Sequence, residues 1–330
     1  MNDARGASDT RAESPGSAPC APCKGAPPAE RALSGRGPRT TSTIALSLSL
    51  LPLILAGCAR HDRVVVGSKN FTESDLLGEI VSQQIARRTN LPVERRFHLG
   101  GTFVCHAAIT AGQIDLYVEY SGTAYTAVLK HPATADSAAV LATVSREYRD
   151  RFGLAWLGAF GFNNTFAILV RRADAERYGL TRISDLGKVA PRWRAGFGYE
   201  FLERTDGFPG LARLYGLRFA AAPTALDLGL TYRALADGRV DVIAGNSTDG
   251  QIEALHLVAL ADDRHYFPPY EAAPVVRAAL LARNPEVAAA LAPLAGKISD
   301  AEMRRLNALA DVAHEDIATV ARDWLARNVP

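Results

Sequence analysis

Three tyrosines lie close together in the stretch DLYVEYSGTAYTAVL, residues 115–129, around a turn-like Ser-Gly-Thr. Tyr117, Tyr120 and Tyr125 follow an alternating apolar run that predicts a strand, and an apolar run that predicts a helix comes next. Large aromatic side chains at the end of a strand have two interpretations. They pack where the core meets the surface, or their faces line a binding site.

Small and polar residues, each time with an aromatic ring or a hydrogen-bond donor, follow the expected strands at seven places. Loops of this composition can hold a small molecule through backbone N–H groups and hydroxyls. Any one of them alone is better explained as an ordinary turn or helix cap, but all of them together predict a ligand-binding protein. The loops are residues 67–74 (GSKNFTES), 99–103 (LGGTF), 119–125 (EYSGTAY), 161–166 (GFNNTF), 198–207 (GYEFLERTDG), 245–250 (GNSTDG) and 267–272 (FPPYEA).

The sequence contains none of the common enzyme motifs. There is no G-x-S-x-G elbow, no phosphate-binding G-x-x-x-x-G-K-[ST] loop and no H-E-x-x-H zinc motif. The stretch GFGYEF, residues 196–201, lacks the third glycine of a dinucleotide loop, and the seven histidines do not pair at metal-ligand spacing. We therefore expect no catalysis, no metal and no cofactor, although a Ser/His/Asp triad stays open at this stage.

Short strands alternate with helices in the chain that must position these loops. Apolar runs at residues 63–67 and 239–245 predict buried strands, whereas the apolar spacing over 73–88 and 225–238 predicts amphipathic helices. The alternation starts near residue 64 and again near 166, and helical patterns follow from residue 284. This order predicts an α/β protein of two lobes with a ligand cleft at the carboxyl ends of the strands.

The chain divides into four parts on this interpretation. Residues 1–57 form a disordered pre-region followed by a signal peptide, and residues 58–165 form the first part of lobe 1. Residues 166–270 form lobe 2, and residues 271–330 return to lobe 1.

The N-terminal region has the order of a secretory signal. Arg36 and Arg39 precede the apolar run IALSLSLLPLILA, residues 44–56, which is too short to span a bilayer comfortably. The run ends in Leu-Ala-Gly-Cys, which resembles the bacterial lipobox, whose cysteine carries the lipid. We therefore expect an exported lipoprotein that is anchored to the membrane through Cys58, on the periplasmic or cell-surface side. Cys105, the other cysteine of the mature body, is expected to be a small buried side chain.

The net charge of the chain argues against one large class of partners, the nucleic acids. The net charge of the 330 residues is +2, but six of the 37 basic and four of the 35 acidic residues lie in residues 1–57, which leaves 31 of each in the remainder. Nucleic-acid-binding proteins normally carry a basic surface. A neutral body therefore argues against nucleic acid as a partner.

The loops together resemble one known family. VVVGSKNFTES, LGGTFVCHAAITAGQIDLYVEYSGTAYTAVL, DVIAGNSTDG and DDRHYFPPYEAAPVV stand in the order found in substrate-binding lipoproteins of osmoprotectant ABC importers. The resemblance covers nearly all of residues 64–327. It implies the type II periplasmic-binding-protein fold, in which two hinge crossovers join the lobes, and an ABC permease and ATPase as partners. It also implies a quaternary ammonium ligand such as glycine betaine, choline or carnitine.

The resemblance assigns aromatic rings to the head of that ligand. A trimethylammonium group donates no hydrogen bond and is attracted to aromatic faces by cation–π interaction. Tyr120 and Tyr270 match tyrosines of the family's aromatic box, and Phe166 keeps the ring of a third without its hydroxyl. Asn246 stands at the fourth box position, where tyrosine is common, and its presence predicts weaker or altered specificity. Tyr117 is assigned to packing, as is Tyr125.

Polar positions carry over in the same way. Lys69 and Arg204 match positions that hold the ligand's carboxylate, and Asn164 and Glu200 line the same region. Lobe 1 is expected to supply Lys69 and Tyr120, and lobe 2 is expected to supply Asn164, Phe166, Arg204 and Asn246, with Tyr270 at the hinge.

Two other functions stay open. The same fold could bind an amino acid or a polyamine, and a polyamine would need several carboxylates where the loops offer chiefly Glu200. An exported two-lobed enzyme would need a base and a nucleophile within hydrogen-bond reach.

Overall fold

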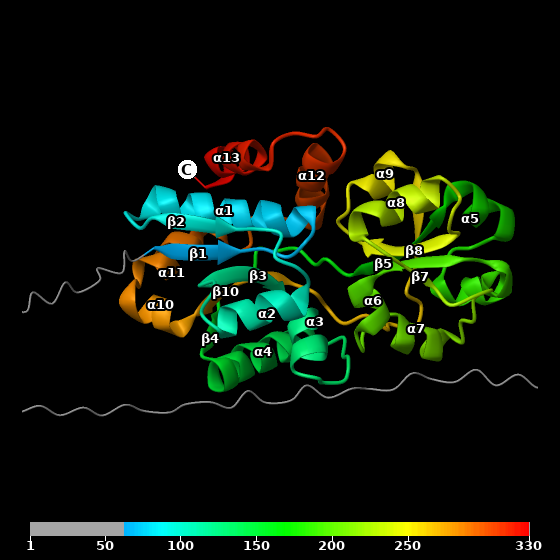
Figure 1. Cartoon of the computed structure of the whole chain (residues 1–330), viewed down its shortest axis with the longest axis horizontal. Coiled ribbons are helices and arrows are strands. Elements are labelled where there is room, and N and C mark those ends of the chain that lie inside the picture. The colour runs from blue at the N-terminus through cyan, green and yellow to red at the C-terminus, as the bar shows by residue number, and fades with distance from the viewer. Residues whose placement is uncertain (1–62, 330) are drawn as a thin grey trace, which may run out of the picture. The chain divides into compact units, whose positions relative to one another are not determined.

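The structure is a computed structural model that describes residues 63–329. It contains two five-stranded sheets, in the orders β2-β1-β3-β10-β4 and β7-β6-β8-β5-β9 (Figure 1). We call the first sheet with its helices lobe 1 and the second sheet with its helices lobe 2. The pre-region, the signal peptide and Cys58 lie outside the described residues.

Lobe 1 has a mixed sheet. β1 pairs in parallel with β2 and β3, and β10 pairs antiparallel with β3 and β4. Its strands are β1 (Val64–Gly67), β2 (Val93–Arg96), β3 (Leu116–Tyr120), β4 (Leu154–Trp156) and β10 (Ala272–Arg277). Its helices are α1 (Thr72–Arg88), α2 (Thr102–Thr110), α3 (Ser121–Thr123), η1 (Ala124–Val128), α4 (Ser137–Phe152), α10 (Ala278–Arg283), α11 (Glu286–Leu291), η4 (Ala292–Leu294), α12 (Asp300–Asp311) and α13 (Ile317–Asn328).

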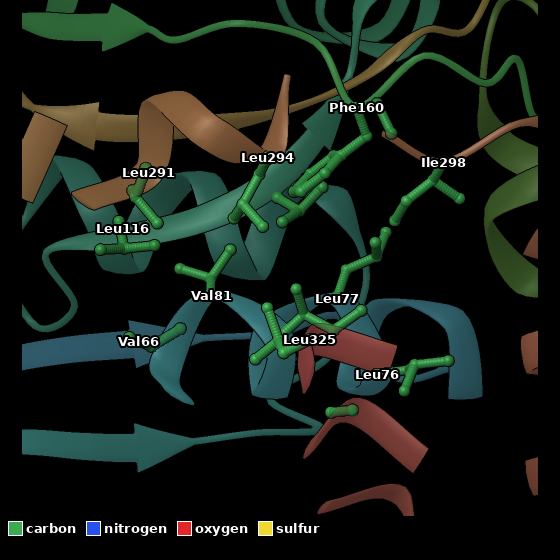
Figure 2. Packing of buried hydrophobic residues seen from close by; sticks show 14 of the residues in the cluster. Val66, Leu76, Leu77, Val81, Leu116, Phe160, Leu291, Leu294, Ile298 and Leu325 are labelled. Atoms are coloured by element: carbon green, nitrogen blue, oxygen red, sulfur yellow. The ribbon is translucent and has the colours of Figure 1, made fainter. Parts of the chain in front are cut away.

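α1 lies at the centre of the lobe 1 core. The apolar positions that predicted it are fully buried, and they face side chains from β1, β3, the segment after β4 and the C-terminal helices (Figure 2). Leu76 and Leu77 are among them, as is Trp324 of α13. Each buried side chain of this size contributes roughly 1.5–3 kcal/mol of hydrophobic stabilisation. This packing fixes the N-terminal end of α1, which carries Glu73.

Lobe 2 repeats the plan with another mixed sheet. β6 pairs in parallel with β7 and β8, and β5 pairs antiparallel with β8 and β9. Its strands are β5 (Phe166–Arg171), β6 (Ala195–Gly198), β7 (Thr224–Leu226), β8 (Val242–Asn246) and β9 (Leu257–Leu260). Its helices are α5 (Arg172–Tyr178), η2 (Ile183–Lys188), η3 (Ala190–Arg192), α6 (Tyr199–Glu203), α7 (Phe208–Tyr215), α8 (Leu228–Ala236) and α9 (Gln251–Ala254).

One helix expected from the sequence is shorter than its pattern. The stretch 225–238 was predicted to be helical throughout, but Thr224–Leu226 forms β7, and α8 begins at Leu228. Asp227 divides the two elements, because its side chain accepts a hydrogen bond from the Gly229 N–H and caps the helix. The prediction failed there because an edge strand of three residues is too short to show its own periodicity.

Two chain segments connect the lobes. Residues 157–165 lead from β4 to β5, and residues 261–271 lead from β9 to β10. They run antiparallel beside each other, with a bridge between Asn163 and Glu271 and a 3.0 Å hydrogen bond from the Asn164 N–H to the Tyr270 carbonyl. These are the two hinge crossovers of the expected type II fold.

The helices between residues 63 and 329 do not include one with the length and apolar composition that a membrane span requires.

Candidate functional site

A cavity of about 360 Å³ lies between the two lobes. Its walls come from the loops after β1 and β3 in lobe 1, from the ends of β6 and β8 in lobe 2, and from the two hinge segments. Its volume falls in the range of small-molecule sites. The eight residues predicted to contact ligand all line it: Lys69, Tyr120, Asn164, Phe166, Glu200, Arg204, Asn246 and Tyr270.

Aromatic rings from three parts of the chain face this cavity. Phe166, the first residue of β5, lies edge-to-face with Tyr270 of the hinge at 5.8 Å between ring centroids. Tyr120 ends β3 and has Phe71 beside it at 6.2 Å. Phe71 was not predicted as a site residue. The loop GSKNFTES contains it, but nothing in the loop distinguished its ring from a packing residue.

The hydroxyls of the two tyrosines are bound to buried carboxylates. The Tyr120 hydroxyl donates to Glu73 Oε1 at 2.7 Å, and the Tyr270 hydroxyl donates to Asp206 Oδ2 at 2.7 Å. Burial, together with the neighbouring carboxylate, raises the pKa of each phenol well above its ordinary value. Both phenols therefore stay neutral, and the hydrogen bonds fix the orientation of their rings.

Glu73 is a second site residue that the sequence analysis missed. Its carboxylate accepts hydrogen bonds from Tyr120, Asn164, Thr248 and Asn307, at 2.5–2.8 Å. Burial raises the pKa of Glu73, and the four hydrogen bonds oppose that shift. A signal existed, because position 73 is three and four residues from the buried Leu76 and Leu77 and so lies on the same helical face.

Lys69 and Arg204 are each already paired with a buried carboxylate. Lys69 Nζ lies 2.5 Å from Glu119 Oε1 and donates to the Thr102 hydroxyl at 3.0 Å. Arg204 donates through Nε and Nη2 to both oxygens of Asp206, at 2.9 and 2.5 Å. Burial by itself lowers the pKa of Arg204, but the Asp206 charge outweighs it and the pKa is raised. Each basic group therefore has an acidic partner within the protein.

Arg204 also connects the aromatic wall with the other lobe. Its guanidinium carbon lies 5.2 Å from the centroid of the Phe166 ring, and its Nη2 donates to the Thr123 hydroxyl at 3.1 Å. The guanidinium thus holds the Phe166 ring from one side. The remaining nitrogen, Nη1, lies 3.7 Å from Glu200 Oε2.

Asn246 lies in a small polar cluster at the end of β8. Its backbone N–H donates to Asp249 Oδ2 at 2.8 Å, and the Tyr232 hydroxyl donates to the same oxygen at 2.5 Å. Burial is the main cause that raises the pKa of Asp249, to about 7. Tyr232 and Asp249 both line the cavity, and neither was predicted. Tyr232 comes from α8, where its spacing was indistinguishable from that of a packing residue.

The two remaining tyrosines of the opening motif do not line the cavity. Tyr117 is fully buried in the lobe 1 core, and Tyr125 packs beside that core and stacks on His131 at 4.8 Å. Both positions agree with the packing role expected for them. Cys105 is buried and free, also as expected.

Hydrogen bonds between the lobes close the cavity. Thr248 of lobe 2 donates to Glu73 of lobe 1, and Glu200 of lobe 2 accepts from the backbone N–H and, at 3.1 Å, the hydroxyl of Thr102 in lobe 1. Within residues 63–329 no group of three or more His, Cys, Asp or Glu side chains is arranged to hold a metal ion. The geometry is that of a site that encloses a solute.

Two α/β lobes around a closed cavity, joined by two crossovers, define a solute-binding protein of the type II periplasmic class. Residues 62–327 match the family model of the substrate binding domain of ABC-type glycine betaine transport systems. A solved structure described as a glycine betaine/carnitine/choline ABC transporter superposes with a TM-score of 0.66 at 31% identity, over 80% of this chain and 98% of that one.

Two characterised relatives are similar in sequence to most of this chain. The carnitine transport binding protein OpuCC of Listeria monocytogenes is 34% identical over 290 residues, which are 87% of this chain and 93% of the relative. The ergothioneine transport permease/ergothioneine binding protein EgtU of Helicobacter pylori is 34% identical over 283 residues, which are 86% of this chain. The match spans 50% of that relative's length.

The chain belongs to the family of substrate-binding domains of ABC-type glycine betaine transport systems. It is therefore an extracytoplasmic binding component of an ABC importer, which implies a small ligand and permease and ATPase partners. The expectation that it is not an enzyme agrees with its relatives, which are transport binding proteins.

Proposed function

We propose that this protein captures a quaternary ammonium osmoprotectant in the cavity between its lobes and delivers it to the permease. The observation that carries the proposal is the set of rings at Tyr120, Phe166 and Tyr270 on the wall of one cavity between the lobes. A desolvated aromatic face contributes up to ~2 kcal/mol to a bound cation. Three faces supply roughly 6 kcal/mol, which alone corresponds to binding between millimolar and micromolar.

The acidic composition of the cavity wall supports a cationic ligand. Among the described residues that line it, six carry carboxylates, and Lys69 and Arg204 are the basic ones apart from His98. The sequence analysis had identified chiefly Glu200 as a carboxylate of the site, so it did not predict this excess of acidic residues. The six are Glu73, Asp75, Glu200, Asp227, Asp249 and Asp311.

The same excess makes a polyamine the second candidate ligand. Polyamines bind through carboxylates that accept hydrogen bonds from their N–H groups, whereas a trimethylammonium head has no N–H to donate. Most oxygens of Glu73 and Asp249 already accept hydrogen bonds from the protein, which favours the quaternary ammonium compound.

Lobe closure couples binding to delivery. A ligand in the cavity touches lobe 1 through Tyr120 and lobe 2 through Phe166 and Asn246, so it stabilises the closed arrangement over an open one. The closed form then docks on the permease. In this assignment lobe 1 comprises residues 58–165 and 271–330, and lobe 2 comprises residues 166–270.

Export and anchoring complete the proposal. The Leu-Ala-Gly-Cys motif at residues 55–58 follows an apolar run of signal-peptide length. Cleavage before Cys58 and lipidation of its thiol would tether the mature protein beside the permease. Replacement Cys58→Ala should release the protein from the membrane fraction and abolish incorporation of labelled fatty acid. Retention of both would contradict the anchor.

Calorimetric titration of residues 59–330 tests the ligand. The panel comprises glycine betaine, choline, carnitine, ergothioneine and spermidine. Tyr120→Leu and Tyr270→Leu should each weaken a quaternary ammonium ligand by about tenfold or more, the loss of one ring of up to ~2 kcal/mol. Tyr125→Leu is the control, because Tyr125 packs outside the cavity. Binding of spermidine alone, or ring substitutions without effect, would contradict the proposal.

A further inference from the structure

Glu200 reaches across the closed cleft to the start of α2. It lies in the first turn of α6 in lobe 2, and its carboxylate accepts hydrogen bonds from the backbone N–H and the hydroxyl of Thr102 in lobe 1. Gly101, the residue before that helix, has no side chain. A Cβ there would collide with the Glu200 carboxylate, so the glycine permits this close approach.

The groups around this carboxylate are the ones that suit an anion. The first turn of a helix presents unpaired N–H groups and a partial positive charge, and α2 has nine residues. Arg204 Nη1 lies 3.7 Å from Glu200 Oε2, and Lys69 Nζ donates to the same Thr102 hydroxyl that Glu200 contacts. The side chain of Glu200 thus occupies the meeting point of Lys69, Arg204 and the α2 N-terminus.

A ligand carboxylate would find little uncompensated positive charge there. Lys69 is paired with Glu119 and Arg204 with Asp206, both pairs being buried. Adding a second carboxylate beside Glu200 would place two like charges within one partly desolvated site, which costs free energy. A ligand whose charge is only positive meets no such cost, and the acidic lining attracts it.

We propose that Glu200 takes the place of a ligand carboxylate, so that the cavity prefers quaternary ammonium compounds without a carboxylate, such as choline, over zwitterionic ones, such as glycine betaine. This inference rests on the proposed function and narrows its ligand class. On this inference Glu200 determines specificity, because its own carboxylate fills the position at which a ligand carboxylate would bind.

Paired titrations of choline and glycine betaine against the mature body, residues 59–330, test the inference. The native protein should bind choline about tenfold or more tightly than glycine betaine. Glu200→Gln keeps an oxygen for Thr102 but removes the charge, and it should bring the two affinities to within about threefold by strengthening glycine betaine. Glu203→Gln is the matched control, because Glu203 lies on the same helix and is exposed. It should leave the ratio unchanged.

The outcomes separate this inference from the function on which it rests. Tighter binding of glycine betaine than choline by the native protein overturns the role of Glu200, and so does an unchanged ratio in Glu200→Gln with a native melting temperature. Binding of none of choline, glycine betaine and carnitine overturns the quaternary ammonium function itself. If the ratio of choline to glycine betaine affinity shifts equally in Glu203→Gln, the effect comes from the net charge of the protein. That result also overturns the inference.

Discussion

The Thr248 hydroxyl of lobe 2 donates a 2.5 Å hydrogen bond to the Glu73 carboxylate of lobe 1. The Asn307 amide of lobe 1 donates both to that carboxylate and, at 2.9 Å, to the Thr248 carbonyl. The contact therefore ties the lobes together at the carboxylate that also accepts the hydrogen bond of the Tyr120 hydroxyl. Closure of the lobes and orientation of the Tyr120 ring therefore both depend on the buried Glu73 carboxylate.

Thr248→Val should weaken ligand binding about threefold to tenfold. Valine preserves the shape and removes one interlobe hydrogen bond, which contributes about 0.5–1.5 kcal/mol to the closed state. Small-angle scattering should report a larger radius of gyration for the ligand-free variant than for the native protein. Thr224→Val, on the exposed edge strand of lobe 2, is the control. Native affinity in Thr248→Val would show that the contact does not hold the closed form.

Glu73→Gln should lower the free energy of unfolding by roughly 1–3 kcal/mol, because one acceptor oxygen becomes a donor and faces two buried donors that lose their partner. Urea denaturation measures the change. Glu286→Gln, on the exposed start of α11, should stay within about 0.5 kcal/mol of the native protein. An increase in stability for Glu73→Gln would mean that the cost of burying the charge exceeds the gain from its hydrogen bonds.

Asp249 makes stability depend on pH. Its pKa in the folded protein is about 7, mainly because of burial, against about 3.9 for an unperturbed aspartate. The folded state therefore holds the proton more tightly between those values, and the free energy of unfolding falls as pH rises from about 4 to 7. Burial also raises the pKa of Glu73, and burial likewise raises that of Asp311, so their contributions have the same sign.

Asp249→Asn should reduce this dependence, since the amide does not titrate. The free energies of unfolding at pH 5 and pH 8, measured by urea denaturation, should differ by roughly 2–4 kcal/mol less in the variant than in the native protein. Equal pH profiles would contradict a titration of Asp249 in this range. Asp227→Asn, on a helix cap at the exposed side of the cavity, serves as the comparison.

Asn246→Tyr should tighten quaternary ammonium binding by up to about tenfold to thirtyfold, because it restores an aromatic face worth up to ~2 kcal/mol. Calorimetry with glycine betaine and choline measures the gain. Asn246→Leu adds comparable apolar bulk without a π face and should not reproduce it. An unchanged affinity in Asn246→Tyr would indicate that Tyr232, which already lines this part of the cavity, supplies the missing ring.

Local patterns predicted most of the framework. The apolar face of α1 and the strand β3 are present in the structure because burial of their apolar side chains drives folding, although β3 is buried on both faces rather than on alternate residues. Most of the residues named from the loops share one cavity because the carboxyl ends of β1, β3, β6 and β8 meet there, and the two hinge segments bring in Asn164, Tyr270 and, at the start of β5, Phe166.

The residues that escaped prediction share a physical cause. Glu73 is a buried acid whose partners lie far away in sequence, such as Asn307, and the burial that raises the pKa of Asp249 likewise comes from the tertiary structure. Tyr232 sits on a helix at a position that suits packing equally well. The pairing of Lys69 with Glu119 is visible only in the tertiary structure, whereas Asp206 stands two residues from Arg204 in the sequence. Both pairs change what the site can accept.

Asn164 and Tyr270 belong to the hinge segments and also line the cavity. A solute that presses on the Tyr270 ring therefore acts on the pivot about which the lobes turn, with no intervening element. Because both connections run antiparallel beside each other, we expect the lobes to close by a hinge rotation about this pair of segments. The permease would then meet a single closed shape whichever solute had produced it, and the rings at the pivot would decide which solutes can produce it.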